Sequence, residues 1–237
     1  MADFTGKNVL VLGGSRGIGA AIVRRFANEE AKLAFTYAGS REAAEALGTE
    51  TGAEVVYADS ADRAQLIAAV AARGALDIII INAGIVVAGD PLTLDADDID
   101  RMIDINVRAP YHAAVEAARN MNDNGRIIVI GSVNGDRMPF AGGAAYALTK
   151  SAVQGMVRGL ARDFGPRGIT VNAIQPGPTD SDMNPADGPD ADLMHSFMAI
   201  KRHAHSDEIA ELTAFVAGPH GAMITGSMQM IDGGFGA

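Results

Sequence analysis

The residues that could carry out chemistry are a serine, a tyrosine and a lysine in the second half of the chain. Ser132 stands just beyond an apolar run, Tyr146 follows fourteen residues later, and Lys150 comes four residues after the tyrosine. On a helix this i, i+4 spacing puts the phenol and the ammonium on one face, where the cation favours the ionised phenol. A phenol beside an ammonium can donate and accept a proton, which is the chemistry that these residue types allow, although this spacing alone often occurs by chance.

A glycine-rich turn near the start of the chain is a second chemical feature. Its pattern is G-x-x-x-G-x-G between an apolar run and an Ala-rich helix. Glycines let the backbone approach a phosphate closely, and the N-terminus of the helix offers free N–H groups. The turn predicts a dinucleotide pyrophosphate site, and a glycine-rich turn without a ligand is the alternative. The residues expected at the cofactor are Gly13, Ser15, Arg16, Gly17, Ile18 and Gly19.

The residues after the next strand predict which dinucleotide is bound. An NAD site usually has a carboxylate about 20 residues after the glycines, which binds the ribose 2′-hydroxyl. The segment from Tyr37 to Arg41 contains no acid, and Arg41, the Ser40 hydroxyl and Arg16 can instead bind a 2′-phosphate. We therefore expect NADP (NADPH), with Tyr37, Ser40 and Arg41 in the site. Arg41 as an ordinary solvated helix residue is the alternative.

Two further turns are expected to border the cofactor. Asp59 and Ser60 follow the third strand, where the Asp59 carboxylate can accept a hydrogen bond from the adenine amine. Asn82, Ala83 and Gly84 follow the fourth strand, and small residues there leave room for the cofactor. Taken singly, either segment is also compatible with an ordinary turn.

These residues need a scaffold that brings strand ends together, and the chain alternates strands with helices. The apolar runs are mostly continuous, as expected when helices cover both faces of a parallel sheet. The pattern predicts an α/β fold, a Rossmann-type three-layer sandwich with a doubly wound, mostly parallel seven-stranded sheet. Ser40, Ser60 and Ser206 are candidate N-caps. The expected strands are Asn8–Leu12, Lys32–Thr36, Glu54–Ala58, Asp77–Ile81, Arg126–Ile130, Thr170–Ile174 and Met228–Ile231, and the expected helices are 17–28, 41–51, 62–73, 96–121, 145–164 and 207–217.

Length and composition narrow the class of protein further. The 237 residues are expected to form one domain, 1–237, in which residues 176–205 have no clear period and predict a lid over the substrate. The absence of cysteine excludes disulfides and thiolate chemistry, and a net charge of −10 argues against nucleic acid. No segment resembles a signal peptide or a membrane span, so we expect a cytoplasmic protein. His112 and His195 have no partners at metal-binding spacing, and no metal is expected.

With these residues in view, the whole chain resembles the short-chain dehydrogenase/reductase family. The resemblance rests on motifs that occur in the family's order at strand and helix ends. The motifs are the Gly13/Gly17/Gly19 turn, Asn82-Ala83-Gly84, Asn106, Ser132, Tyr146-x-x-x-Lys150, Pro176-Gly177, Thr225-Gly226 and Asp232-Gly233-Gly234. Because the family usually forms dimers or tetramers, the resemblance also implies a homo-oligomer.

The resemblance implies a role for each site residue. Tyr146 is the general acid in carbonyl reduction and the base in alcohol oxidation, and Ser132 binds the oxygen of the small-molecule substrate. Lys150 binds the nicotinamide ribose and favours the ionised phenol, while Asn106 supports a water that relays protons to Lys150. Hydride transfer then belongs to NADP(H). The residues expected near the nicotinamide are Pro176, Gly177 and Ser181.

Three positions depart from the family pattern. Leu12 replaces the threonine that usually precedes the first motif glycine, which removes a side-chain hydrogen bond and predicts a looser turn. Ile81 replaces the first asparagine of Asn-Asn-Ala-Gly, and Ser181 replaces a threonine but keeps a hydroxyl. None of the three belongs to the catalytic set.

A narrower resemblance raises a second function. Residues 131–139 and 158–170 are similar to a bacterial member of the family that is described as sequestering cyclic-di-GMP and so promoting biofilm dispersal. A ligand with two phosphates needs polar and basic partners, for which guanidinium groups are well suited. The alternative is a structural use of these groups, for example Arg137 with Asp136 or Asp182. The candidate ligand-binding residues are Asn134, Arg137, Lys201 and Arg202.

Overall fold

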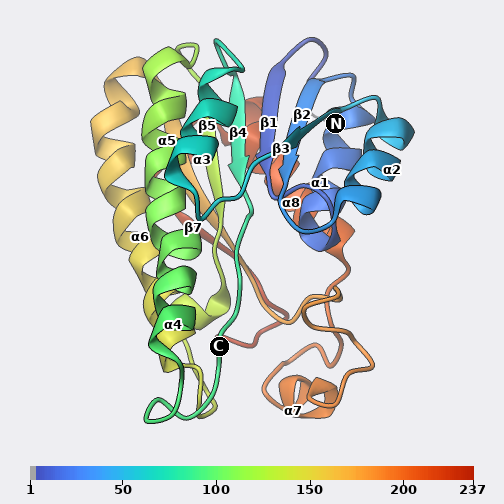
Figure 1. The fold of residues 1–237 in the computed structure, drawn as a ribbon, viewed down its shortest axis with the longest axis vertical. Helices are drawn as coiled ribbons and strands as arrows, with labels where there is room; N and C mark the ends of the chain where they lie inside the picture. Colours follow the sequence, from blue (N-terminus) through green and yellow to red (C-terminus); the bar gives the residue numbers. More distant parts are fainter. Residues whose placement is uncertain (1–3) are drawn as a thin grey trace.

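Seven parallel strands form one sheet at the centre of the computed structural model, which describes residues 4–237 (Figure 1). The order reverses its direction between β1 and β4, and ligands of such sheets bind outside the carboxyl ends of the strands at this switch point. From edge to edge the strands are β3 (Glu54–Tyr57), β2 (Lys32–Tyr37), β1 (Asn8–Leu12), β4 (Ile78–Ile81), β5 (Arg126–Ile130), β6 (Thr170–Pro176) and β7 (Met228–Ile231).

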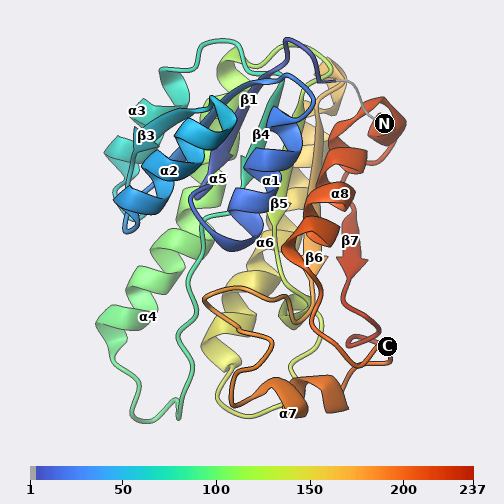
Figure 2. The same ribbon diagram turned by 90° about the vertical axis from the view of Figure 1, so that its right-hand side faces the viewer.

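Helices cover both faces of the sheet, and the three layers confirm the predicted fold class (Figures 1 and 2). In β1, Val9 and Val11 pack against the helices of one face, whereas Leu10 and Leu12 pack against those of the other. Within residues 4–237, no helix has the length and apolar character that crossing a membrane requires. One face carries α1 (Gly17–Ala27), α2 (Arg41–Thr51) and α8 (Ser206–Ala217), and the other carries α3 (Arg63–Ala71), α5 (Ala109–Asn120), which follows α4 (Ala96–Ile103), and α6 (Ala144–Phe164).

The helix expected over 96–121 is present, but it is not regular. A π-helical turn, Asp104–Arg108, joins α4 to α5 and contains Asn106. The N–H of Ala109 bonds to the carbonyl of the first residue of this turn, five residues back. Pro110 has no N–H, so the bond that the Asn106 carbonyl would receive in an α-helix cannot form. The expected helical stretch is therefore present, with a π-helical turn at the position of a candidate site residue.

Two segments extend beyond the carboxyl ends of the strands and flank the site. Residues 82–95 lead from β4 to α4, and residues 176–205 contain the short helix α7 (Ala191–Ser196), which lies near the C-terminus of the chain (Figure 2). An isolated parallel bridge between Thr179 and Ala204 joins the two ends of the second segment.

The N-cap residues of three helices agree only in part with the expected ones. Ser40 is the N-cap residue of α2 but makes no side-chain hydrogen bond to the helix. Asp62 caps α3 in place of Ser60, because its carboxylate accepts from two N–H groups of the first turn. His205 is the N-cap residue of α8, and Ser206 is its first helical residue.

Candidate active site

The glycine turn between β1 and α1 is held by side chains from two neighbouring strands. The Gly13 N–H donates to Thr36 Oγ1 of β2 (3.0 Å), and the Gly13 carbonyl accepts from Asn82 Nδ2 after β4 (2.7 Å). Gly13 has a φ of +76°, and a Cβ there would lie 2.8 Å from the main chain of Ala83, so only glycine fits. Thr36 supplies a hydroxyl to the same turn, where Leu12 has no side-chain hydrogen bond to offer.

The first turn of α1 has no side-chain cap. Its N-cap residue, Arg16, is extended and makes no side-chain hydrogen bond to the helix. The first N–H groups therefore need partners from outside the helix, and an anion satisfies both them and the helix dipole. Gly19 packs so closely on Gly13 that a Cβ would lie 2.1 Å from the Gly13 carbonyl oxygen. With Ser15 and Ile18 partly exposed in it, the turn fits a dinucleotide pyrophosphate.

Arg41 after β2 and Arg16 in the glycine turn present two cations to solvent. The side chain of Arg41 is 78% exposed, and its Nε donates to Glu45 (2.7 Å), which raises the pKa of the Arg41 guanidinium above its usual value. Arg16 is also largely exposed and lies 3.8 Å from Asp182. Exposed pairs of this kind are worth little, so either cation can exchange its carboxylate for a phosphate. The other expected residues here, Tyr37 and Ser40, are partly exposed.

Asp59 and Ser60 form a partly exposed turn after β3. The Asp59 carboxylate accepts from the Ala61 N–H (2.9 Å) and lies 3.5 Å from Arg101 of α4. A carboxylate has about four acceptor positions, so Asp59 keeps the capacity to bind an amine.

Lys150 is the central charge of the candidate site. The residue is 7% exposed, and its Nζ donates to the Ile130 carbonyl at the end of β5 (3.2 Å). Nζ lies 5.7 Å from the centroid of the Tyr146 ring, one turn earlier on α6. No carboxylate among residues 4–237 forms an ion pair with Lys150. Lys150 therefore places a buried positive charge one turn along α6 from the Tyr146 ring.

The Asn106 side chain is fixed by hydrogen bonds to two segments. It accepts from the Ile85 N–H and donates to the Ile85 carbonyl, both at 2.9 Å, and it also donates to Thr149 Oγ1 (3.1 Å). A Cβ on Gly84 would lie 3.4 Å from Asn106 Oδ1 and 3.6 Å from Lys150 Nζ. Because Gly84 has no side chain, Asn106 Oδ1 and Lys150 Nζ can both lie close to its main chain. The sequence pattern does not predict the part played by Thr149.

Ser132 begins a tight turn that packs against α6. Its Oγ accepts from the Asn134 N–H (3.1 Å) and donates to Asn134 Oδ1 (3.3 Å). Gly135 follows, and a Cβ there would lie 2.9 Å from the main chain of Lys150. Ser151 Oγ donates to the Gly135 carbonyl (2.7 Å). These contacts lock the turn that starts at Ser132 onto the turn of α6 that carries Lys150.

The segment after β6 reaches the glycine turn. A Cβ on Gly17 would lie 3.3 Å from Ser181 Cβ, so Ser181 stands next to the turn that fits the pyrophosphate. Pro176 is buried at the end of β6, and a Cβ on Gly177 would lie 2.7 Å from Asp232. These residues occupy the carboxyl edge of the sheet, where the resemblance predicts the nicotinamide.

The candidate ligand-binding residues after Ser132 bond to the chain itself. Arg137 Nη1 donates to the carbonyl oxygens of Phe235 (2.8 Å) and Ala237 (2.5 Å), and the Arg137 carbonyl accepts from Asn134 Nδ2 (3.1 Å). Arg137 thus joins this turn to residues 235–237. Its role here is structural, as the alternative proposed, but its partners are main-chain carbonyls and not Asp136 or Asp182.

The two basic residues before α8 are also bonded internally. Arg202 donates to both carboxylate oxygens of Glu208 (2.7 and 2.8 Å), and Lys201 Nζ donates to the Ser196 carbonyl (3.1 Å). The Glu208 bond raises the pKa of Arg202, and the same bond lowers the pKa of Glu208 to about 2.

Two histidines join α7 to the end of its segment. His195 Nε2 and His203 Nδ1 lie 2.8 Å apart, so His195 is not isolated as its spacing suggested. His203 is 4% exposed, and its Nε2 is buried without a partner. Burial and, next, the neighbouring His195 lower the pKa of His203 below 6.5. Across residues 4–237, no three His, Asp or Glu side chains gather as a metal site requires.

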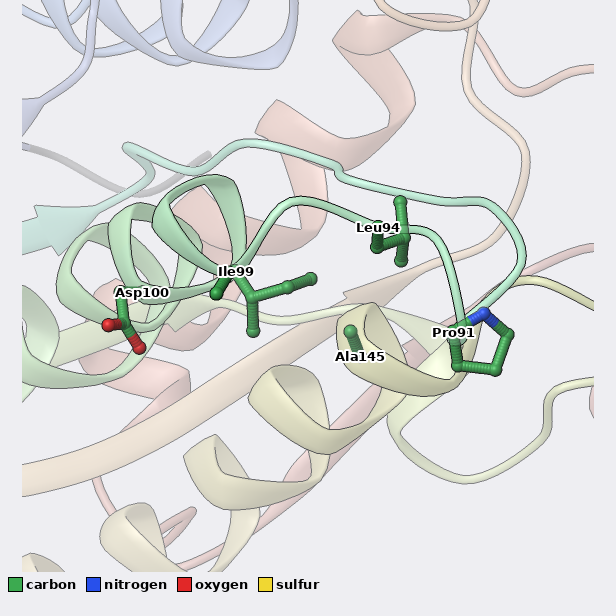
Figure 3. A pocket seen from close by; sticks show the side chains of 6 residues that line it. Pro91, Leu94, Ile99, Asp100 and Ala145 are labelled. Carbon is green, nitrogen blue, oxygen red and sulfur yellow. The ribbon is translucent and has the colours of Figure 1, made fainter.

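A pocket of about 370 Å³ lies beside the first turn of α6 (Figure 3). Its walls come from the segment after β4, from α4 and from α6, where Ala145 immediately precedes Tyr146. None of the predicted catalytic residues lines it, so the pocket adjoins the candidate site without containing it. The lining residues are Pro91, Leu94, Ala96, Ile99, Asp100 and Ala145.

Comparison with known proteins identifies the class to which this fold and site belong. A family model described as enoyl-(acyl carrier protein) reductase matches residues 13–236. The chain belongs to the short-chain dehydrogenase/reductase family, as its glycine turn and its Ser132, Tyr146 and Lys150 motifs predict.

Individual relatives are similar over almost the whole chain. The cyclic-di-GMP-binding biofilm dispersal mediator protein of Escherichia coli (strain K12) is 63% identical over 237 residues, which is 100% of both chains. A crystal structure of BdcA in complex with NADPH aligns with a TM-score of 0.98 and 64% identity, over 99% of this chain and 96% of that chain. A short chain dehydrogenase from Burkholderia cenocepacia J2315 in complex with NADP aligns with a TM-score of 0.97 and 48% identity, over 99% of both chains.

Proposed function

We propose that the protein is an NADP(H)-dependent oxidoreductase that interconverts a carbonyl and an alcohol. The observation that carries the proposal is the buried Lys150 ammonium, 5.7 Å from the Tyr146 ring and without a carboxylate partner among the described residues. This arrangement supports a phenol that releases and regains a proton during turnover. A protein that only binds a nucleotide has no need of such a phenol.

Each residue of the set has a part in the proposed reaction. Ser132 Oγ turns its proton from Asn134 Oδ1 to the substrate oxygen, and Tyr146 delivers a proton to that oxygen when a carbonyl is reduced. In the reverse direction the phenolate removes the proton of the alcohol. Lys150 stabilises the phenolate, and the Asn106 carbonyl, freed by Pro110 from its helical bond, can hold a water that returns protons to Lys150. When bound, NADPH supplies the hydride.

The proposed cofactor follows from the two ends of the nucleotide site. The uncapped first turn of α1 suits a pyrophosphate. Arg41 ends a segment, residues 37–41, that contains no carboxylate, and Arg41 and Arg16 are both exposed cations. The two crystallised relatives, one with NADPH and one with NADP, support the same assignment.

The test is the oxidation of NADPH in the presence of a panel of ketones and aldehydes, followed by absorbance. Tyr146→Phe removes only a hydroxyl and should lower kcat by about 100-fold or more, while calorimetry should find NADPH affinity nearly unchanged. Tyr111→Phe makes the same change on the exposed side of α5 and should keep the wild-type rate. Full turnover by Tyr146→Phe would contradict the proposal.

Binding of cyclic-di-GMP is the second function to test, because the relative that is 63% identical is named for it. In this chain Arg137 and Arg202 already bond to Phe235, Ala237 and Glu208, so the ligand would have to displace those partners. Calorimetry with cyclic-di-GMP should give the same affinity for wild type and Tyr146→Phe if the two sites are separate. Absence of any binding heat would leave the oxidoreductase as the only function proposed.

A further inference from the structure

Ser132 is held from a second direction by a side chain of the neighbouring strand. Gln175 of β6 is 1% exposed, and its Nε2 donates to the Ser132 carbonyl (3.0 Å). Its Oε1 is buried without a hydrogen-bond partner. An orphaned buried acceptor destabilises a fold, so a glutamine here needs a reason beyond packing.

The reason lies in the hydrogen-bond ladder between β5 and β6, which stops at this point. The last main-chain bond joins the Gly131 N–H to the Ile174 carbonyl (2.7 Å). In a parallel pair the next N–H of β6 that faces β5 would come from residue 176, which is a proline and has none. Beyond the last main-chain bond, the side-chain amide of Gln175 donates from β6 to the Ser132 carbonyl, which follows β5.

Gly131 leaves room for the contact between Gln175 and Ser132, and the Gly135 N–H adds a second hydrogen bond to the Ser132 carbonyl. A Cβ on Gly131 would lie 3.3 Å from the Ile174 carbonyl and 3.4 Å from Gln175 Cγ, so a side chain there would crowd the glutamine. From the other side, the Gly135 N–H also donates to the Ser132 carbonyl (3.0 Å). Two donors from different segments therefore fix the peptide that carries the Ser132 hydroxyl.

We propose that Gln175 is a positioning residue of the reaction, which fixes the Ser132 peptide so that Oγ is held toward the oxygen that Tyr146 protonates. The inference rests on the proposed function, because it gives Ser132 a substrate oxygen to bind. Gln175 is 1% exposed and its side-chain hydrogen bond is to Ser132, so the proposed effect passes through Ser132.

Kinetics of two Gln175 variants test the proposal. Gln175→Met keeps the length of the side chain and removes the donor, and Gln175→Glu keeps its shape but replaces the donor with an acceptor. Both should lower kcat about tenfold, the effect of losing one hydrogen bond, and leave the KM for NADPH unchanged. Gln154→Met is the matched control, since Gln154 is a buried amide of α6 whose Nε2 has no partner, and it should keep the wild-type kcat.

A double mutant shows whether the effect passes through the serine. In a Ser132→Ala background, Gln175→Met should lower the residual kcat no further. Independent, multiplicative losses in kcat would overturn the positioning role and reduce Gln175 to a structural residue.

Amide hydrogen exchange gives a readout that does not depend on turnover. The N–H groups of Asn134 and Gly135 bond to Ser132 Oγ and to its carbonyl, and in Gln175→Met both should exchange about tenfold faster, but not in Gln154→Met. Wild-type exchange together with wild-type kcat would overturn the inference and leave the proposed function intact. Faster exchange in a protein whose wild type reduces no carbonyl would instead overturn the proposed function, and the catalytic role of Gln175 with it.

Discussion

Polar residues inside apolar strands support the site at the scale of single residues. Thr36 and Gln175 are 2% and 1% exposed, and each bonds to a turn that carries chemistry. Tyr146 and Lys150 could be predicted because their i, i+4 relation is local. The partners of Thr36 and Gln175 lie on other strands, so spacing does not reveal them. The available signal is the polar residue itself, because a buried polar group in an apolar run needs a hydrogen-bond partner.

Thr36→Val tests the support of the glycine turn. The substitution keeps the side-chain volume but leaves the Gly13 N–H without its partner, so the free energy of unfolding should fall by about 1–3 kcal/mol. Urea unfolding measures this change, and NADPH titration should show weaker binding. Thr49→Val on the exposed side of α2 is the control and should change stability by no more than about 0.5 kcal/mol.

Arg41→Asp tests the choice of dinucleotide. A carboxylate at this position repels a 2′-phosphate and can bind a 2′-hydroxyl, so the ratio of NADP to NAD affinity should fall about tenfold or more. Glu45→Gln removes the present partner of Arg41 and should keep or increase the preference for NADP. Equal ratios in wild type and Arg41→Asp would show that Arg41 does not select the cofactor.

At the scale of elements, the apolar runs predict every strand of the sheet, with ends that differ by at most two residues. β6, for example, runs on to Pro176, because its pairing with β7 continues after pairing with β5 has stopped. The π-helical turn is invisible to periodicity, since the helix on either side of it keeps one apolar face. Its signal in the sequence is Pro110, four residues after Asn106, which removes the donor that a regular helix would use there.

Pro110→Ala tests whether the irregular turn serves the reaction. Alanine supplies the missing N–H and favours a regular helix, which would occupy the Asn106 carbonyl and shift its side chain. We expect kcat to fall about tenfold while the melting temperature stays the same or rises, because helix propensity improves. An unchanged kcat in a variant with a regular helix would show that the free carbonyl is not needed.

At the scale of the whole molecule, the outer faces of α5 and α6 expose apolar side chains. Tyr111 and Leu148 are 49% and 60% exposed, and a Cβ on Gly155 or Gly159 would meet open space. A face of this kind fits the homo-oligomer that the family resemblance implies.

Leu148→Glu tests this expectation. A charge in the middle of an apolar contact between two copies should shift the particle toward monomer in light scattering. Leu193→Glu, a similarly exposed leucine on α7, should leave the mass unchanged. The same mass for all three proteins would argue against association through α5 and α6.

The histidine pair makes stability depend on pH. The pKa of His203 is lowered from 6.5 in the folded protein, chiefly by burial, so the unfolded chain binds a proton more readily. The contribution of this histidine is fully present above pH 6.5 and is lost as the pH falls below 6.5 toward the lowered pKa. Melting temperatures between pH 7.5 and 5 should therefore fall more steeply for wild type than for His203→Gln. His220→Gln, at an exposed position, should keep the wild-type slope.

The bond between Gly13 and Asn82 spans 69 residues of sequence, and this distance bears on how the protein is made. During synthesis β1 and β2 emerge first and can pair, but the bend between β1 and α1 stays incomplete until β4 has left the ribosome. The serine, tyrosine and lysine follow later still. A nascent chain interrupted before residue 82 therefore contains only part of the nucleotide pocket, and coenzyme can stabilise the fold only late in translation.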